Sequence, residues 1–342
     1  MARNAKQAKR ATIRDVARVA GVSVGAASTA LSNVSSNVTL SKETRARILR
    51  TAAELRYRPL AAARAMTAAR YRTIGVLATE YCMTGSFYGG VLRGLANEAE
   101  ELGYSLLLKT VRTRLDMQDA SIFSEHQIDG VIIPAEAEQR THVALRHYDI
   151  PHVWVNTELH EPFNCVHVDD VQGTALAVDH LVRLGHRRIA FLHHFTGERH
   201  HVTVKRERGY LEGLKRHKLQ PVATYERCMD IAEHVGLYLK MKPRPTALVA
   251  FSDAMAILAC NALVKQGLRI PDDMSVVGHE GVVLHAYGFC KLTTVTAPVE
   301  ELGRTAVRML VGQFTAGEPA PSVVLPETLE VNESTGPPPR EG

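Results

Sequence analysis

The sequence predicts an α/β protein with a small three-helix unit at its N-terminus, followed by a two-lobed body of doubly wound parallel sheets. The chain has 342 residues, more than one ordinary hydrophobic core accommodates. From about Thr73 onward, short apolar runs alternate with helical runs, which is typical of parallel sheets covered by helices. About 260 residues of this alternation are enough for two lobes with a cleft between them. Upstream of Thr73, apolar residues recur at helical spacing instead.

Capping residues and a glycine divide the N-terminal segment into three helices. Thr12 is placed to N-cap a helix at 13–20, Gly21 interrupts the chain, and Ser23 is placed to cap a second helix at 24–31. After a polar loop at 32–39, Ser41 is placed to cap a third helix at 42–55. The side chains expected to face inward are Ile13, Val16, Ala17, Ala20, Ile48, Leu49, Ala52 and Leu55. A helix, a tight turn and a second capped helix form a helix-turn-helix, whose second helix enters the DNA major groove.

A proline marks the end of this unit. Pro59 stops the third helix, and the Ala-rich residues 60–68 could form a hinge helix too short to be stable alone. The expected divisions are a disordered basic arm (1–11), the helix-turn-helix domain (12–58), a hinge (59–72), the body (73–335) and a disordered tail (336–342). Within the body, lobe 1 is expected at about 73–168 and 298–320, and lobe 2 at about 169–297 and 321–335.

The charge is distributed unevenly along the chain. Residues 1–72 hold fifteen lysines and arginines against three acids, a net charge of +12, whereas the remainder is at −7. A basic head on an acidic body is the electrostatic pattern of a polyanion binder. The alternative, a merely solubilising basic tail, explains less well the apolar helical periodicity that runs through the same segment.

Composition also limits the other classes of protein. The five cysteines are scattered and include no Cys-x-x-Cys pair, so neither a disulfide framework nor a zinc ribbon is predicted. The first ten residues are charged and do not form a secretory signal, and no apolar run is long enough to span a membrane. A cytoplasmic protein without a membrane partner is expected.

Two histidine pairs invite a metal interpretation. His193-His194 and His200-His201 flank a loop after a predicted strand. No cysteine or carboxylate completes a recognisable ligand spacing there. A solvated or effector-facing loop is therefore expected, with no metal site and no cofactor.

The body is expected to alternate strands and helices. The predicted strands are 74–78, 105–108, 130–134, 153–156, 189–193, 247–251 and 276–278. The predicted helices are 87–102, 171–184, 204–216, 254–266 and 299–311.

The head carries a specific motif, and it points to a family. Residues 12–28 read TIRDVARVAGVSVGAAS, followed later by Tyr57-Arg58-Pro59 and by the segment 72–76, RTIGV. The chain resembles the lactose/galactose repressor family, whose heads read T-I-x-D-V-A-x-x-A-G-V-S-x-x-T-V-S-R, and the resemblance extends to about residue 332. It implies a sequence-specific DNA-binding transcription regulator, expected to be a repressor, with a periplasmic-binding-protein-like body. It also implies a homodimer on near-palindromic double-stranded operator DNA and a small-molecule effector bound between the lobes.

The resemblance assigns the DNA contacts to the first two helices and the hinge. The candidate DNA-binding residues are Thr12, Ser23, Val24, Gly25, Ser28, Thr29 and Met66. The hydroxyls at helix starts suit phosphates, although the same hydroxyls can serve only as helix caps. Met66 stands where the family inserts a leucine wedge into the minor groove, and the alternative is packing within the dimer.

The recognition helix departs from the family pattern. Ala26, Ala27 and Thr29 replace the usual Thr, Val and Arg. Val24 can contact a thymine methyl, whereas Gly25 offers no side chain to bond a base. We therefore expect fewer direct base contacts and more reliance on the DNA backbone and shape.

The resemblance also assigns the effector site to positions near the carboxyl ends of strands, where clefts form in open sheets. The candidate effector-binding residues are Phe87, Tyr88, Arg206, Ser252, Asp253 and Glu280. Arg206 could clamp a hydroxyl pair or a carboxylate, the two acids could accept from sugar hydroxyls, and the aromatic rings could pack on a ligand ring. The alternatives are core packing for the aromatics, including Trp154, and a structural ion pair between Arg206 and Asp253. The resemblance implies a sugar effector, but Ser252-Asp253 replaces the usual Asn-Asp and His279-Glu280-Gly281 replaces the usual aromatic-Asp-Asp. The expected class of effector is therefore widened to a sugar or a related polar metabolite.

The sequence supports two other functions, an enzyme and a solute-binding protein, less well. No Gly-x-Gly-x-x-Gly loop, P-loop or Gly-x-Ser-x-Gly elbow follows a predicted strand, which argues against the common nucleotide-dependent enzymes and hydrolases. A solute-binding protein or sensor without specific DNA reading remains the alternative, but it leaves the basic head unexplained.

Overall fold

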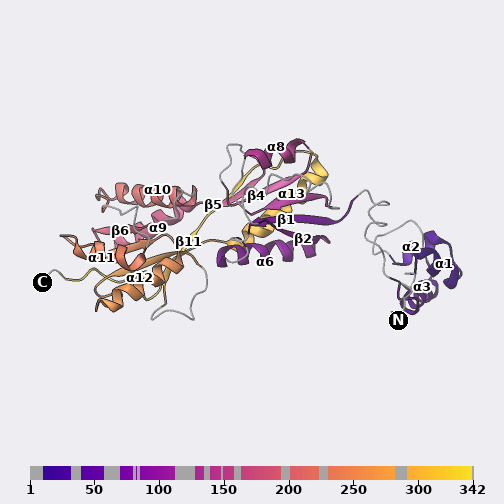
Figure 1. The fold of residues 1–342 in the computed structure, drawn as a ribbon, viewed down its shortest axis with the longest axis horizontal. Helices are drawn as coiled ribbons and strands as arrows, with labels where there is room; N and C mark the ends of the chain where they lie inside the picture. The colour runs from indigo at the N-terminus through magenta and orange to yellow at the C-terminus, as the bar shows by residue number, and fades with distance from the viewer. Residues whose placement is uncertain are drawn as a thin grey trace, which may run out of the picture. The chain divides into compact units, whose positions relative to one another are not determined.

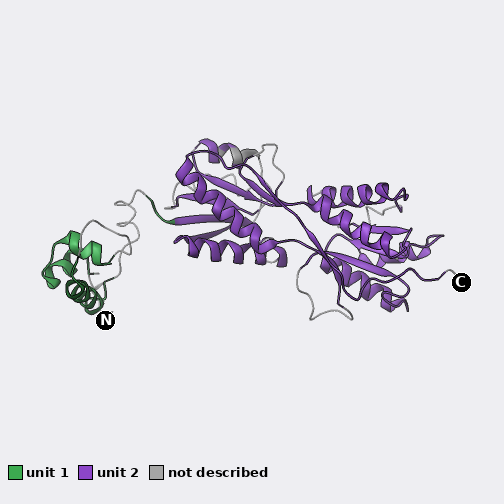
Figure 2. Ribbon diagram, turned by 180° about the vertical axis from the view of Figure 1, so that it is seen from behind, with its two compact units in different colours: residues 1–72 green, residues 73–342 purple. Residues whose placement is uncertain are grey.

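The computed structural model describes residues 11–31, 40–57, 70–79, 82, 85–111, 128–134, 139–147, 149–157, 163–193, 201–222, 230–281 and 291–340. The chain divides into two compact units, Met1–Arg72 and Thr73–Gly342 (Figures 1 and 2). Each unit is described by itself. Most of the predicted basic arm and of the hinge, including Met66, lies outside the described residues.

Unit 1 contains the three predicted helices. They are α1 (Ile13–Ala20), α2 (Val24–Leu31) and α3 (Lys42–Glu54). Their buried side chains form one small core of Val16, Ala17, Ala20, Ala27, Ala30, Ile48 and Ala52. The prediction that Leu49 faces inward is wrong, since Leu49 is 47% exposed. Ile48 and Ala52 are four residues apart and share a helix face, whereas the next residue after Ile48 is rotated about 100° away from it.

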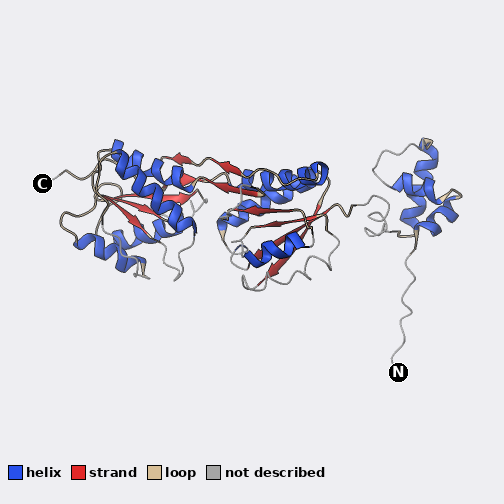
Figure 3. Cartoon of the chain, turned by 90° about the horizontal axis from the view of Figure 1, so that it is seen from above, coloured by secondary structure: helices blue, strands red, loops and turns tan. Residues whose placement is uncertain are grey.

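Lobe 1 of unit 2 is built on a six-stranded sheet of order β10-β5-β4-β3-β1-β2. All of its described strand pairs are parallel. The strands are β1 (Thr73–Thr79), β2 (Ser105–Val111), β3 (Gly130–Ile133), β4 (His152–Val155), β5 (Cys165–Val168) and β10 (Val323–Leu325). The helices of this lobe are α6 (Ser86–Glu101), α8 (Gln139–His147) and α13 (Val299–Ala316). The apolar runs of β1, β3 and β4 are buried, as expected for strands covered on both faces (Figure 3).

Lobe 2 is built on a five-stranded sheet of order β11-β9-β8-β7-β6. Its strands are β6 (Ile189–Leu192), β7 (Ala247–Ala250), β8 (Ser275–Glu280), β9 (Thr293–Thr296) and β11 (Thr328–Glu330). Only β11 runs antiparallel to its neighbour among the described pairs. The helices are α9 (Asp170–Arg183), α10 (His201–Arg216), α11 (Ile231–Lys240) and α12 (Asp253–Lys265).

Alternation along the lobe 2 strands creates two separate cores, one on each face of the sheet. Ala190 and Leu192 join the core that includes α11 and α12. Ile189 and Phe191 join the opposite core with α9 and α10. Successive residues of a strand point to opposite faces, so a fully apolar strand such as β6 supplies both cores.

Three segments connect the lobes. The chain passes from β5 to α9, from β9 to α13 and from β10 to β11. The first two crossings agree with the predicted boundaries near residues 168 and 298. The third is different, because β10 pairs with β5 and therefore belongs to lobe 1, whereas the prediction assigned 321–335 to lobe 2. A three-residue strand carries too little pattern to reveal which sheet it joins.

The end of the chain also corrects a prediction. The structure describes the tail as far as Arg340, and Gly336 is bound to lobe 2. Its N–H donates to Ser275 Oγ over 3.1 Å, and its carbonyl lies 2.8 Å from His186 Nε2. The tail is therefore anchored at Gly336 by backbone hydrogen bonds, which sequence composition does not reveal. No described helix is long and apolar enough to cross a membrane.

Candidate functional site

The predicted cap of α1 is formed by a reciprocal pair of side chains. The Asp15 N–H donates to Thr12 Oγ1, while Thr12 donates both its N–H (2.9 Å) and its hydroxyl (2.7 Å) to Asp15 Oδ2. These bonds hold the pKa of Asp15 below its usual value, with the Thr12 backbone contributing most. Capping is thus confirmed for Thr12, and both of its donors are engaged within the helix.

The α2 helix presents the predicted reading residues to solvent. Ser23, Val24, Gly25 and Ser28 are exposed and Thr29 is half-buried. Ser23 Oγ accepts from the Ala26 N–H over 3.1 Å, so its hydroxyl hydrogen remains a possible donor to a phosphate. The buried side of α2 is made of alanine, which lets the helix pack closely while its other face stays uncovered.

Arg206 is the centre of an ion cluster inside lobe 2. It is buried on α10, and its Nε donates to Asp170 Oδ1 over 2.7 Å. Its Nη1 bonds the Phe251 carbonyl and lies 3.4 Å from Glu280 Oε1. The Phe251 ring also lies under the guanidinium, 4.7 Å from its carbon. Burial disfavours the charged guanidinium, but the neighbouring carboxylates outweigh it and raise the pKa of Arg206.

Glu280 closes one side of this cluster. Its side chain is 23% exposed and its backbone has a φ of 106°, a region that residues with side chains rarely occupy. Burial raises the pKa of its carboxyl, and the Arg206 charge offsets only part of that rise. The structure therefore brings the two predicted effector residues Arg206 and Glu280 together.

The other predicted effector residues are engaged elsewhere. Asp253 is buried and accepts from the Thr294 hydroxyl, so it does not form the alternative ion pair with Arg206. Ser252 caps α12 by accepting from the Met255 N–H over 3.3 Å. These contacts fix the backbone where β7 ends and α12 begins.

The aromatic candidates belong to the core of lobe 1. Phe87 and Tyr88, at the start of α6, are 7% and 8% exposed, and their rings meet edge-on with centroids 5.3 Å apart. Trp154 is completely buried in the same core. The core alternative is thus confirmed for Trp154, and the first two side chains present little surface to a ligand in this conformation.

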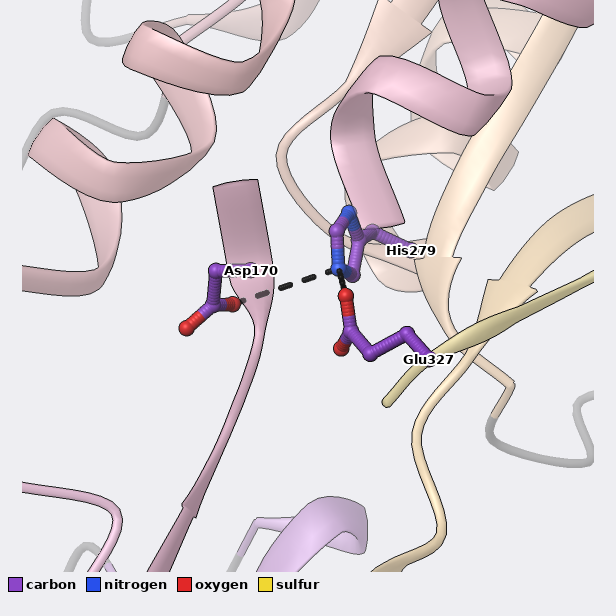
Figure 4. Close-up of side chains that lie close together, drawn as sticks. All are labelled: Asp170, His279 and Glu327. Atoms are coloured by element: carbon purple, nitrogen blue, oxygen red, sulfur yellow. Dashed lines mark hydrogen bonds and ion pairs between the residues drawn. The ribbon is translucent and has the colours of Figure 1, made fainter. Parts of the chain in front are cut away.

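Three buried residues that could bind a ligand were not predicted as site residues, although His279 was noted as a departure from the family pattern. They are Asp170, His279 and Glu327, which converge on one point (Figure 4). His279 Nε2 lies 2.9 Å from Glu327 Oε2 and 3.9 Å from Asp170 Oδ1. Because Glu327 is 48 residues from His279 along the chain, no local spacing could have revealed the pair.

The histidine loop is only partly described. His193 is buried on the strand side of this loop and lies 3.8 Å from Glu207 Oε1, and His201 begins α10. His194 and His200 fall outside the described residues.

Comparison with known proteins explains the architecture. Residues 12–59 match the model of the lacI family of bacterial regulatory proteins, and residues 178–335 match a periplasmic binding protein-like domain. A transcriptional repressor named PurR from Aliivibrio salmonicida is 31% identical over 312 residues, which cover 88% of this chain and 91% of the relative. The chain belongs to the lacI family. The ribose operon repressor of Haemophilus influenzae is also 31% identical, covering 95% of this chain and 98% of its own.

Solved structures agree with the lacI assignment. A lac repressor dimer bound to operator and the anti-inducer ONPF superposes with a TM-score of 0.80 at 26% identity, covering 96% of this chain and all of that one. A complex of the regulator CelR with cellobiose gives a TM-score of 0.68, also at 26% identity. The protein is a lacI-family DNA-binding transcription regulator with an effector-binding body, and its relatives are regulators rather than enzymes.

Proposed function

We propose that the chain acts as a homodimeric repressor that reads a near-palindromic operator through the exposed face of α2. The main support for this proposal is that Val24, Gly25 and Ser28 are exposed on α2, whereas Ala27 and Ala30 are buried. A helix that packs through alanine and leaves this face free matches the way recognition helices enter the major groove. The lac repressor dimer bound to operator supports the same partner and dimeric state. Binding to chromosomal DNA would place the protein in the cytoplasm.

The base contacts available on this face are few, so much of the binding energy is expected from phosphates. The described head exposes Arg14, Arg18, Lys42, Arg45, Arg47, Arg50 and Arg56. Each phosphate neutralised by such a side chain releases counterions, so the affinity falls steeply with salt. The hinge, with Met66, is proposed to add a minor-groove wedge.

The proposed effector is a hydroxyl-rich polar metabolite, bound between the lobes and contacting Arg206, Glu280, Ser252 and Asp253 after local rearrangement. Relatives named for ribose, for arabinose metabolism and for a cellobiose complex support this chemistry. Among these candidates, Glu280 has a partly exposed side chain and also forms an ion pair with Arg206. Closure of the lobes around the effector would alter the spacing of the two heads and so the operator affinity.

A matched pair of variants tests the reading face. Val24 and Val19 are both exposed valines of the head, at 45% and 56%. Replacing either with glutamate changes the head by one charge, but only Val24→Glu alters α2. Titrations of full-length protein against its upstream DNA and random DNA, over a salt series, should show at least a tenfold loss of sequence preference for Val24→Glu and a retained preference for Val19→Glu. Equal losses in both variants would remove α2 as the reader.

A further inference from the structure

The cluster of Asp170, His279 and Glu327 offers one imidazole nitrogen and two carboxylates inside lobe 2. Their ligand atoms all lie within 4.8 Å of one another, and all three residues are buried. The side chains come from the start of α9, the end of β8 and the segment between β10 and β11 (Figure 4). We propose that this cluster binds a divalent d-block cation, with Zn²⁺ as the probe. Imidazole with carboxylate suits such ions better than Mg²⁺ or Ca²⁺, which prefer oxygen ligands alone.

The spacing of the ligand atoms fits a tetrahedral ion. Bonds of about 2.1 Å at tetrahedral angles place neighbouring ligand atoms about 3.4 Å apart. The two distances from His279 Nε2 are 2.9 Å to Glu327 and 3.9 Å to Asp170, on either side of that value. All three ligand atoms lie within 4.8 Å of one another, so side-chain shifts would bring them to the spacing of a bound ion.

The His279 ring is oriented as a ligand. The Thr174 hydroxyl donates to the Asp170 carbonyl over 2.8 Å, so its oxygen is left to accept a bond from His279 Nδ1, 3.5 Å away. In the structure Nε2 lies at hydrogen-bond distance from Glu327 Oε2, and because a carboxylate only accepts, Nε2 is the donor. A bound ion would take the place of that proton, with the His279 proton then on Nδ1 and the Nε2 lone pair on the ion. Metal-bound histidines usually donate their second nitrogen to such an outer partner, which fixes the tautomer.

One buried carboxylate oxygen in the cluster has no hydrogen-bond partner. Glu327 Oε1 is unpaired, while Oε2 of the same group faces His279, and the side chain has no exposed surface. Leaving a charged oxygen dry and unpaired is costly, so such an atom requires a compensating group. A cation between Glu327 and His279 would supply it.

The charges of the surrounding side chains favour the same conclusion. Three carboxylates, Asp170, Glu280 and Glu327, act on the single guanidinium of Arg206. The described cluster thus places three carboxyl groups around one guanidinium, an arrangement that has room for a further positive charge. Arg206 would remain on Asp170 as the outer partner of a ligating carboxylate. The ion would tie two of the three connecting segments to the lobe 2 sheet.

The experiment uses the full-length protein, treated with EDTA and desalted. Zn²⁺ is titrated by calorimetry, Co²⁺ absorption reports the coordination, and thermal melts are recorded with and without Zn²⁺. The wild-type protein should bind one equivalent of Zn²⁺ at this cluster, more tightly than any Zn²⁺ bound by its other histidines. It should also melt at a higher temperature when Zn²⁺ is present. Glu327→Gln should weaken that equivalent at least tenfold and lose the thermal shift. The control is His217→Gln, which removes an exposed histidine paired with Asp179 at 2.8 Å and should leave the tight equivalent unchanged.

Either of two results would overturn the proposal. Wild type and Glu327→Gln could bind Zn²⁺ with the same stoichiometry and affinity, or Zn²⁺ could leave the wild-type melting temperature unchanged. The cluster would then be an ion network held by protons alone. If Glu327→Gln does not melt cooperatively, Thr174→Val serves instead, because it removes the partner of His279 Nδ1 while keeping all three ligand side chains, and it should weaken Zn²⁺ binding about tenfold.

Discussion

Each lobe holds a carboxylate–guanidinium cluster, and the two clusters differ in the ratio of carboxylates to guanidinium groups and in the exposure of their arginines to water. In lobe 1, Glu98 of α6 receives Arg308 through two bonds of 2.7 and 2.9 Å and Arg304 through a third of 2.8 Å. These arginines are 49% and 25% exposed. In lobe 2, Arg206 and Asp170 are sealed from solvent, and acids outnumber the guanidinium.

This difference assigns different roles to the two clusters. Water reaches the lobe 1 arginines, so removing one partner leaves groups that solvent can hydrate, and the cluster serves to hold α6 against α13. Water does not reach the lobe 2 pair, so each removal leaves an uncompensated charge. A dry cluster with excess negative charge is suited to bind a ligand or an ion as well as to support the fold.

The largest expected effect is the loss of the lobe 2 guanidinium. Arg206→Met should lower the free energy of unfolding of the body by about 3–5 kcal/mol, because three carboxylates lose their only guanidinium partner in the cluster. Urea unfolding followed by circular dichroism measures it. The matched change in lobe 1, Arg308→Met, should cost well under half as much. Equal costs would show that exposure does not separate the two clusters.

A neutral buried histidine gives lobe 2 a pH dependence of its own. His234 is 1% exposed and stacks on Tyr238, with centroids 5.0 Å apart. Burial, aided by His193, lowers the pKa of His234 to about 4. The unfolded chain therefore takes up the proton first, and stability present above the unfolded value of about 6.5 is lost as the pH falls towards 4.

The measurement compares urea unfolding of wild type and His234→Phe at pH 7 and pH 4. Wild type should lose about 1–3 kcal/mol more than the variant over this range. The control is His147→Phe, which replaces an exposed histidine of α8 and should follow wild type. A wild-type profile parallel to that of His234→Phe would show that folding does not lower the pKa of His234, since the ring would then take up its proton equally readily in the folded and unfolded chains.

The smallest expected effect is in the lobe 1 cluster. Hydrogen bonds from Arg308 hold the pKa of Glu98 below its ordinary value. The contribution of the Glu98 carboxylate to the free energy of unfolding is therefore complete above about pH 4.5, and it is lost as the pH falls below that value. Glu98→Gln should cost about 1–2 kcal/mol at pH 7, and the difference from wild type should shrink in acid. The control, Glu101→Gln, changes an exposed partner of Arg304 and should cost less than about 0.5 kcal/mol.

The sequence predicted the site unevenly. It identified Arg206 and Glu280, which the structure brings together, and it identified the exposed residues of α2. It did not identify Asp170 or Glu327, because their significance depends on three distant segments meeting. It also treated Asp253 as a possible partner of Arg206, whereas Asp253 accepts a hydrogen bond from Thr294 of β9.

The sequence by itself determined the local elements and the family. The caps at Thr12 and Ser41, the break at Gly21 and the apolar strands act over a few residues, where intrinsic preference decides the conformation. Only the tertiary structure decided that β10 and β11 lie in different sheets, that Gly336 is anchored, and that Glu327 meets His279. These outcomes depend on the order of strands in each sheet and on the burial of charged groups. Both are set by segments far apart in the chain, so the residues next to each position do not predict them.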